Sequence, residues 1–383
     1  MSGVQEQTIK EPESVMMSRI RIVFVLLVAA AALLCWSGRA LAAASCYVVS
    51  SDIGYVCDTN PPPSSFSKPV VLHDSILPKL KFGKLADNVN VYAEPNMGSP
   101  IVRNAGDGFL FYTIEDTANN QAEGRLWYMI DPGEWVRGED ITLKAVSSFT
   151  GVELRAQPQR PFGWMIVDFA YSDAPGAEPS ATAIKLPRYT FLEVYDAVVD
   201  DEGWIWYDVG QGRWMKQTYV SIIEPNPRPS EVGEDEYWVE VDLYEQNFVA
   251  YEGDRMVYAG LVSSGLNRWP TYEGLFQVWD RHMQATMIGA EGKVDYYVVE
   301  DVPHTMYFNV DIALHGAYWH DRFGYKHSHG CVNMPLRDAE WIYFWSENAP
   351  NDLWVWVHTS DPHSYFERAD TERVDAPDGT AGP

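Results

Sequence analysis

Short apolar runs dominate the chain beyond residue 80, and each is broken after a few positions by Gly, Pro or Asp. Typical examples are the continuous run at 109–112 and the alternating run at 190–195. Side chains of a strand point alternately to opposite faces of a sheet, so this pattern predicts many short strands joined by tight turns. We therefore expect a mainly β protein.

One arrangement of residues occurs twice in this region. A Glu-Gly pair, a Trp-Tyr pair, a Gly and a Trp occur in the same order at 123–135 and at 202–214, each displaced by 79 residues. A repeated unit of this size with short strands is typical of tandem small β-barrels. We therefore expect two SH3-like β-barrel modules, at 80–150 and 151–223, with their tryptophans in the cores rather than exposed for ligand stacking.

The segment 224–236 separates this repeat from the rest of the chain. It contains prolines and acidic residues and has no apolar periodicity, which is typical of a linker. Beyond it, alternation over 239–244 and a Glu-Gly-Asp turn at 252–254 predict a hairpin. We expect a third domain, mostly of strands, over 237–360.

One helix is expected in this third domain. Pro335 precedes Ala339, Ile342 and Trp345, which would share one helical face, and proline is tolerated where a helix begins. A final strand is expected near the end of the domain, and the polar tail 361–383 is expected to be disordered.

The N-terminal segment has the composition of an export signal. Arg19 and Arg21 precede an apolar run at 22–36, which small residues follow. The run is shorter than the roughly twenty residues that span a bilayer, so we expect a cleaved signal peptide over 1–42 rather than a retained anchor. A lipid anchor on Cys46 is a weaker alternative. The protein is thus expected to be exported to the cell envelope and associated with the wall.

Length and charge narrow the classes of function. A chain of 383 residues is long for a single hydrophobic core, which agrees with several domains. The formal net charge of −26 argues against a nucleic-acid partner, because phosphate binding needs clustered Lys and Arg. We expect a monomer with a self-repelling extracellular surface.

The cysteines leave one thiol unpaired. Cys35 lies in the predicted signal, and Cys46 and Cys57 are close enough in sequence to form a disulfide within the segment 43–79. Cys331 then remains free. An unpaired thiol in an exported protein suggests a function.

Cys331 lies in the sequence Ser-His-Gly-Cys-Val-Asn at 328–333, and His315 lies sixteen residues before it. A cysteine with a pKa of about 8.5 is mostly protonated at neutral pH, so it needs a nearby base to attack as thiolate. His315 can accept the proton if the fold brings it within about 3 Å. Gly330 and Cys331 could direct backbone N–H groups at an oxyanion. This pattern predicts a thiol acyltransferase.

The domain over 237–360 resembles the L,D-transpeptidase catalytic domain of the YkuD family. The resemblance is carried by the segments 241–246, 263–265, 271–276, 315–316 and 328–333. It implies an L,D-transpeptidase-type β-sandwich preceded by two SH3-like modules, which resemble bacterial SH3-type domains of cell-wall enzymes and could contact wall polymer.

The resemblance also implies a reaction on peptidoglycan stem peptides. Cys331 would attack the carbonyl that joins the third residue of a stem tetrapeptide, a diamino acid, to the terminal D-alanine. D-alanine leaves, and an amine of a neighbouring stem resolves the thioester into a 3→3 cross-link. Water in place of the amine would give carboxypeptidase activity.

By the same resemblance His315 transfers the proton and the Gly316 carbonyl orients its ring. No cofactor or metal is implied. The other implied site residues are His329 and Gly330 with the backbone of the oxyanion site, Ser328 and Asn333 as supports of the loop, and Tyr297 as a substrate-binding lid residue.

The chain departs from the family pattern at two places. Gly316 is followed by Ala317 instead of the Ser or Thr of many relatives, so a backbone carbonyl must orient His315. The turn at 271–274 keeps its glycine but has Tyr272 where relatives have proline.

Three other interpretations remain open. The same site could attach a protein to the wall. The protein could bind wall without catalysis. A zinc cluster could form from the residues His315, His320, His327, His329 and Cys331.

Overall fold

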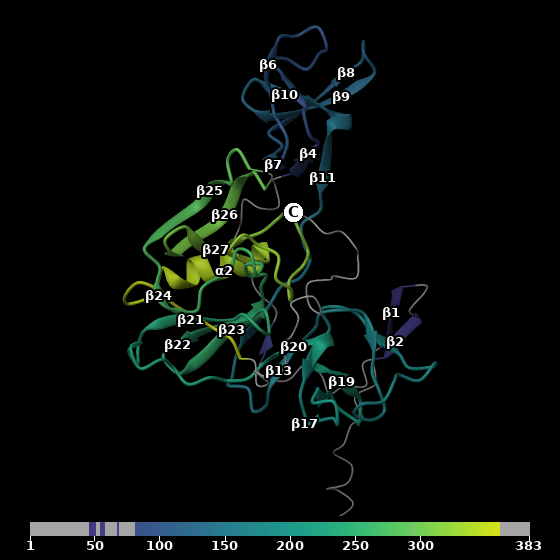
Figure 1. The fold of residues 1–383 in the computed structure, drawn as a ribbon, viewed down its shortest axis with the longest axis vertical. Helices are drawn as coiled ribbons and strands as arrows, with labels where there is room; N and C mark the ends of the chain where they lie inside the picture. Colours follow the sequence, from purple (N-terminus) through teal and green to yellow (C-terminus); the bar gives the residue numbers. More distant parts are fainter. Residues whose placement is uncertain (1–45, 51–53, 58–66, 69–80, 294, 361–383) are drawn as a thin grey trace, which may run out of the picture. The chain divides into compact units, whose positions relative to one another are not determined.

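The computed structural model describes residues 46–50, 54–57, 67–68, 81–293 and 295–360 (Figure 1). The predicted signal peptide and C-terminal tail lie outside them. So do the side chains of Cys46 and Cys57, whose backbones lie in β1 (Cys46–Ser50) and β2 (Gly54–Cys57), so their disulfide stays a prediction. No helix among the described residues is long and apolar enough to cross a membrane.

The described part of the chain is mainly β, as predicted. The first repeat unit comprises β4 (Phe82–Leu85), β5 (Asn90–Tyr92), β6 (Ile101–Asn104), β7 (Phe109–Thr113), β8 (Asp116–Asn120), β9 (Arg125–Asp131), β10 (Glu134–Arg137), η2 (Gly138–Asp140) and β11 (Ile141–Lys144). The second comprises β12 (Val152–Leu154), β13 (Phe162–Met165), β14 (Phe169–Ala170), β15 (Lys185–Leu186), β16 (Phe191–Glu193), β17 (Asp196–Val199), β18 (Ile205–Asp208), β19 (Trp214–Lys216), η3 (Gln217–Tyr219) and β20 (Val220–Ile223).

The sequence repeat is also a structural repeat. The short helix η3 lies 79 residues after η2, and the strand β20 lies 79 residues after β11, which is the displacement of the sequence repeat. Trp127 and the equivalent Trp206 are buried, at 0% and 8% exposure, which agrees with a core role. Trp135 and Trp214 are only half-buried.

The strands of the two units form open sheets. The first unit contributes the sheet β6-β5-β10-β9-β8, and the second contributes β16-β13-β20, β14-β15 and β17-β18-β19. No sheet of the described residues closes on itself, so the SH3-like barrel is not confirmed.

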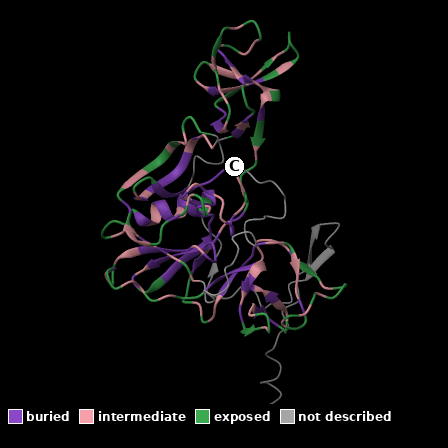
Figure 2. Ribbon diagram, viewed as in Figure 1, coloured by how far each residue is buried: buried purple, intermediate pink, exposed green. Residues whose placement is uncertain are grey.

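The third region packs two sheets and one helix around a shared core. Val241, Phe248, Met306, Leu314 and Ile342 from five different elements belong to one buried cluster. Figure 2 shows buried residues along these strands and the helix. The elements are β21 (Tyr237–Asp242), β22 (Asn247–Glu252), β23 (Arg255–Leu261), β24 (Gly274–Gln277), β25 (Asp280–Gly289), β26 (Tyr297–Asn309), β27 (Ile312–Gly316), β28 (Val332–Met334), α2 (Leu336–Ser346) and β29 (Trp354–His358).

The predicted hairpin, helix and final strand are confirmed as β22–β23, α2 and β29. Pro335 is the N-cap of α2, and Ala339 and Ile342 are fully buried on its inner face. Gly253 in the hairpin turn has a φ of +56°, and a Cβ there would lie 2.0 Å from the Glu234 carbonyl oxygen, so the turn requires glycine.

Two sheets continue across the predicted domain boundaries. One has the order β11-β4-β7-β26-β27-β28, with β25 also paired to β26. The other has the order β24-β29-β21-β22-β23-β12-β3, where β3 is Ser67–Lys68. Within the predicted linker, Val232 is 1% exposed. The boundaries stay predictions, but strands from both repeat units are built into the sheets of the third region.

The first of these shared sheets has its own buried core. Phe82 and Phe111 of the first unit cluster with Tyr318 and Leu336 of the third region. The Phe82 and Tyr318 rings stack at 3.7 Å between centroids. Packing across the boundary therefore stabilises both regions together.

We expect Phe111→Ala to lower the free energy of unfolding by about 3–5 kcal/mol, because it leaves a cavity at a 1% exposed site. Denaturant unfolding measures the loss. Leu126→Ala, at a 40% exposed position of the same unit, is the matched control and should stay within about 0.5 kcal/mol of the parent. A loss below about 1 kcal/mol for Phe111→Ala would contradict the shared core.

Candidate active site

Two adjacent parallel strands bring the histidine and the cysteine together. In the pairing of β27 with β28, His315 lies opposite Asn333 and Leu314 lies opposite Val332. Alternation then places His315 and Asn333 on one face and the fully buried Leu314 and Val332 on the other, toward the core. Cys331, two residues before Asn333, extends the first face.

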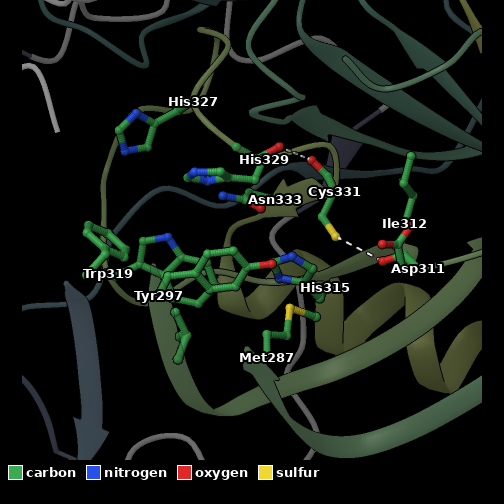
Figure 3. A pocket seen from close by; sticks show the side chains of 13 residues that line it. Met287, Tyr297, Asp311, Ile312, His315, Trp319, His327, His329, Cys331 and Asn333 are labelled. Atoms are coloured by element: carbon green, nitrogen blue, oxygen red, sulfur yellow. Dashed lines mark hydrogen bonds between the residues drawn. The ribbon is translucent and has the colours of Figure 1, made fainter. Parts of the chain in front are cut away.

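This face forms the wall of a pocket of about 100 Å³ (Figure 3). His315 is 1% exposed, whereas Cys331 is half-buried. The lining residues are Phe109, Met287, Tyr297, Val299, Asp311, Ile312, His315, Trp319, His327, Ser328, His329, Cys331 and Asn333. All the sequence-predicted site residues except the glycines are therefore gathered around one space.

The loop that carries Cys331 is fixed by its own hydrogen bonds. The Ser328 hydroxyl donates to the Cys331 carbonyl and accepts from the Gly330 N–H at 3.1 Å. Gly330 has a φ of +123°, which disfavours any other residue. The Gly330 N–H is thus engaged by Ser328 here, and its role in an oxyanion site stays a prediction.

Segments far upstream hold the same loop. The Ser263 N–H and carbonyl exchange hydrogen bonds of 2.9 Å with those of Asn333. The Thr271 hydroxyl donates to the Gly330 carbonyl at 2.7 Å and accepts from the Gly265 N–H at 2.9 Å. The motifs at 263–265 and 271–276 therefore support the cysteine loop, and Thr271 does so without the proline of relatives.

Burial keeps the His315 ring neutral. Its Nδ1 lies 3.2 Å from the Gly316 carbonyl oxygen, so a protonated Nδ1 donates there and leaves Nε2 unprotonated. Desolvation lowers the pKa of His315 to about 4, against a smaller opposing effect of the Gly316 carbonyl. The ring can therefore accept a proton at neutral pH.

Burial also keeps Cys331 protonated at rest. Desolvation raises the pKa of its thiol to about 11, although hydrogen bonding from the Ala313 backbone lowers it and the nearby Asp311 raises it. The thiol donates to the Asp311 carbonyl at 3.7 Å. At neutral pH the resting site thus holds a thiol and a neutral imidazole.

Aromatic rings enclose the opposite side of the pocket. The His329 ring contacts the ring of Trp269, at 3.8 Å between centroids, and that of Tyr297, at 5.2 Å. Burial raises the pKa of Tyr297 to about 12, and the neighbouring Cys331 adds to the increase. Tyr297 therefore keeps a hydroxyl proton that can be donated within the pocket.

The remaining histidines contact each other and protein groups. Asn333 Nδ2 lies 2.8 Å from His320 Nε2, and the ring of His320 lies edge-on to that of His327 at 4.6 Å. Within 81–293 and 295–360, no three His, Cys, Asp or Glu side chains are arranged to hold a metal ion.

Several pocket residues are absent from the sequence predictions. Phe109, Met287 and Val299 come from strands distant along the chain, and Asp311 contributes through its backbone. No local motif marks them. Only the pairing of β7 and β25 with β26 brings their side chains to the site.

Comparisons with known proteins identify this region. Residues 236–364 match the family model of the L,D-transpeptidase catalytic domain, YkuD. A Bacillus subtilis protein named "Putative L,D-transpeptidase YciB" is 29% identical over 126 residues, which cover 30% of this chain and 61% of that protein. The chain thus spans less than two thirds of this relative.

Solved structures also match, with low TM-scores. An Enterococcus faecium L,D-transpeptidase mutant is 24% identical, with 32% of this chain and 50% of that chain covered and a TM-score of 0.29. An L,D-transpeptidase from Mycobacterium smegmatis is 17% identical, with 56% of this chain and 93% of that chain covered and a TM-score of 0.30. The likeness of residues 236–364 to L,D-transpeptidase catalytic domains therefore rests on the family model.

We expect alkylation of Cys331 by iodoacetamide to accelerate about tenfold per pH unit from pH 7 to 10, because the thiolate fraction rises toward a pKa of about 11. Mass spectrometry of the peptide that contains Cys331 measures the rate. Glutathione, a small free thiol treated in parallel, should level off near pH 9. If the alkylation rate of Cys331 instead reached a plateau below pH 8, the resting site would hold a thiolate–imidazolium pair.

Proposed function

We propose that the L,D-transpeptidase catalytic domain of the YkuD family, which residues 236–364 of this chain form, is an active cysteine acyltransferase of peptidoglycan. The observation that carries this proposal is the register of β27 and β28, which directs His315 and Cys331 into one pocket. Its substrates are stem peptides, and its place of action is the cell envelope.

The proposed first step forms a thioester. As the substrate displaces water, His315 Nε2 accepts the thiol proton and Cys331 Sγ attacks the carbonyl between the diamino acid and the terminal D-alanine. Backbone N–H groups of 329–331 and the Tyr297 hydroxyl stabilise the oxyanion. The C–N bond then breaks, and D-alanine leaves with the proton held by His315.

The second step decides the product. An amine from the third residue of a neighbouring stem gives its proton to His315 and attacks the thioester carbonyl, which restores the Cys331 thiol. The product is a 3→3 cross-link. If water attacks instead, the product is a tripeptide, and the enzyme is an L,D-carboxypeptidase. A protein amine as acceptor would attach that protein to the wall.

The tandem β units are proposed to have a second role as SH3-like modules that contact wall polymer. Their strand content and repeat support this proposal. In a non-catalytic alternative they would provide the entire function of the chain.

We expect Cys331→Ala to abolish both the covalent carbapenem adduct and the conversion of a stem tetrapeptide, since it removes the nucleophile. Intact-mass spectrometry detects the adduct, and liquid chromatography with mass spectrometry separates dimer, tripeptide and untouched tetrapeptide by mass. Circular dichroism checks that the variant is folded. An adduct that persists in Cys331→Ala, or a parent protein that leaves the tetrapeptide untouched, would contradict the proposal.

We expect His315→Gln to slow acylation at least about 100-fold at pH 7, because general-base catalysis is lost. Stopped-flow or timed mass spectrometry with a carbapenem gives the rate. Raising the pH should recover part of the rate in this variant, as hydroxide replaces the missing base. His282→Gln, at an exposed histidine on β25, is the matched control. Equal rates for His315→Gln and the parent would exclude His315 as the base.

A further inference from the structure

The first repeat unit adds a strand to the sheet of the catalytic domain. β7 pairs with β26 in parallel, with Phe109 opposite Tyr297 and Phe111 opposite Val299. The Phe109 N–H also donates to the Tyr296 carbonyl at 2.9 Å. The catalytic sheet therefore continues directly into β7, β4 and β11 of the first unit.

Alternation on these strands places one face toward the active site. Phe109 and Phe111 share their face with Tyr297 and Val299, and three of these four residues line the pocket of Cys331. Phe111 is buried, whereas Phe109 is half-buried with its ring at the pocket. The first unit thus contributes Phe109 to the lining of the pocket.

Two lysines continue the same face. Lys84 lies opposite Phe111 in the pairing of β4 with β7, and its Nζ lies 5.2 Å from the centroid of the Phe109 ring. Lys144 on β11 has its Nζ 6.0 Å from the Phe111 ring. Both side chains are half-buried, and neither forms an ion pair with any residue that the structure describes.

This local charge is opposite to that of the chain. The chain has 54 acidic residues against 28 Lys and Arg, yet two lysines without carboxylate partners lie over the rings of Phe109, which lines the pocket, and of its neighbour Phe111. Each ammonium group lies over an aromatic ring, a contact that leaves its hydrogen-bond donors without a carboxylate. Such an arrangement favours an anionic ligand that extends from the pocket along this face.

We propose that the first repeat unit is part of the acyl-donor site. Phe109 forms an apolar wall against the donor peptide, and Lys84, with Lys144 behind it, binds the terminal carboxylate of that peptide. This inference rests on the proposed function, because it takes the stem tetrapeptide as donor. It makes the unit a substrate-binding element and not only a spacer, and it makes Lys84 a determinant of specificity for donors with a free C-terminal carboxylate.

The test measures binding and needs no turnover. Tetrapeptide affinity is measured by calorimetry in the Cys331→Ala background, where Lys84→Met removes the charge and keeps the apolar stem. Lys84→Met should weaken binding about tenfold, as expected for a lost charge-assisted hydrogen bond. Lys84→Arg should retain most of the affinity. Lys81→Met, at an exposed lysine three residues away, is the matched control and should bind like the Cys331→Ala parent.

A second ligand identifies the group that Lys84 contacts. A tetrapeptide with a C-terminal amide should bind about tenfold more weakly to the Cys331→Ala parent, and Lys84→Met should cause no further loss with this ligand. Phe109→Ala should weaken the binding of both ligands by the same factor, and Phe109→Tyr should restore it. Iodoacetamide, a neutral reagent, should alkylate Cys331 equally fast with and without Lys84→Met in the wild-type background.

The outcomes separate the two proposals. The inference is overturned if Lys84→Met binds the tetrapeptide as tightly as Lys81→Met does. It is also overturned if replacing the terminal carboxylate by an amide costs as much affinity in Lys84→Met as in the parent, or if no variant binds the tetrapeptide. The proposed function fails separately, if the wild-type protein binds the tetrapeptide but does not convert it.

Discussion

The parallel pairing of β27 with β28 determines whether His315 and Cys331 face one pocket. Because successive side chains alternate between faces, a slip by one residue would turn Leu314 toward the pocket and His315 into the core. The register is held by hydrogen bonds of Asn333 to Ser263 and by apolar packing of Leu314 and Val332. Catalytic geometry here is thus a consequence of core packing on the opposite face.

The same burial sets the electrostatics of the site. The fully buried imidazole of His315 loses its charge, and the desolvated thiol of the half-buried Cys331 keeps its proton, so their pKa values move apart. The resting pair is therefore neutral. In the proposed reaction, proton transfer is therefore part of the acylation step, and the proposed oxyanion site and the substrate stabilise the charges that develop.

The shared sheets connect the repeat units to the chemistry. Phe82 and Phe111 pack on Tyr318, directly beyond the catalytic strand β27, and Phe109 reaches the pocket itself. A change in the first unit is therefore expected to alter the stability of the third region and the shape of its pocket. The buried Asp338 of α2 adds another link, since it accepts a hydrogen bond of 2.9 Å from the N–H of Gly151, which directly precedes β12.

The sequence by itself determined the local and the chemically unusual features of this protein. These were the mainly β pattern, the displacement of 79 residues, the helix after Pro335, and the cysteine and histidine whose spacing matches a known family. The β pattern and the helix depend on residues that are close together in the sequence. The cysteine and histidine belong to residue types that are often used for nucleophilic and acid–base chemistry. Tertiary structure alone decided that Phe109 reaches the pocket, that Lys84 lies over its ring, and that the repeat units form open sheets. Strand pairing between distant segments depends on the packing of whole faces, which no local pattern records.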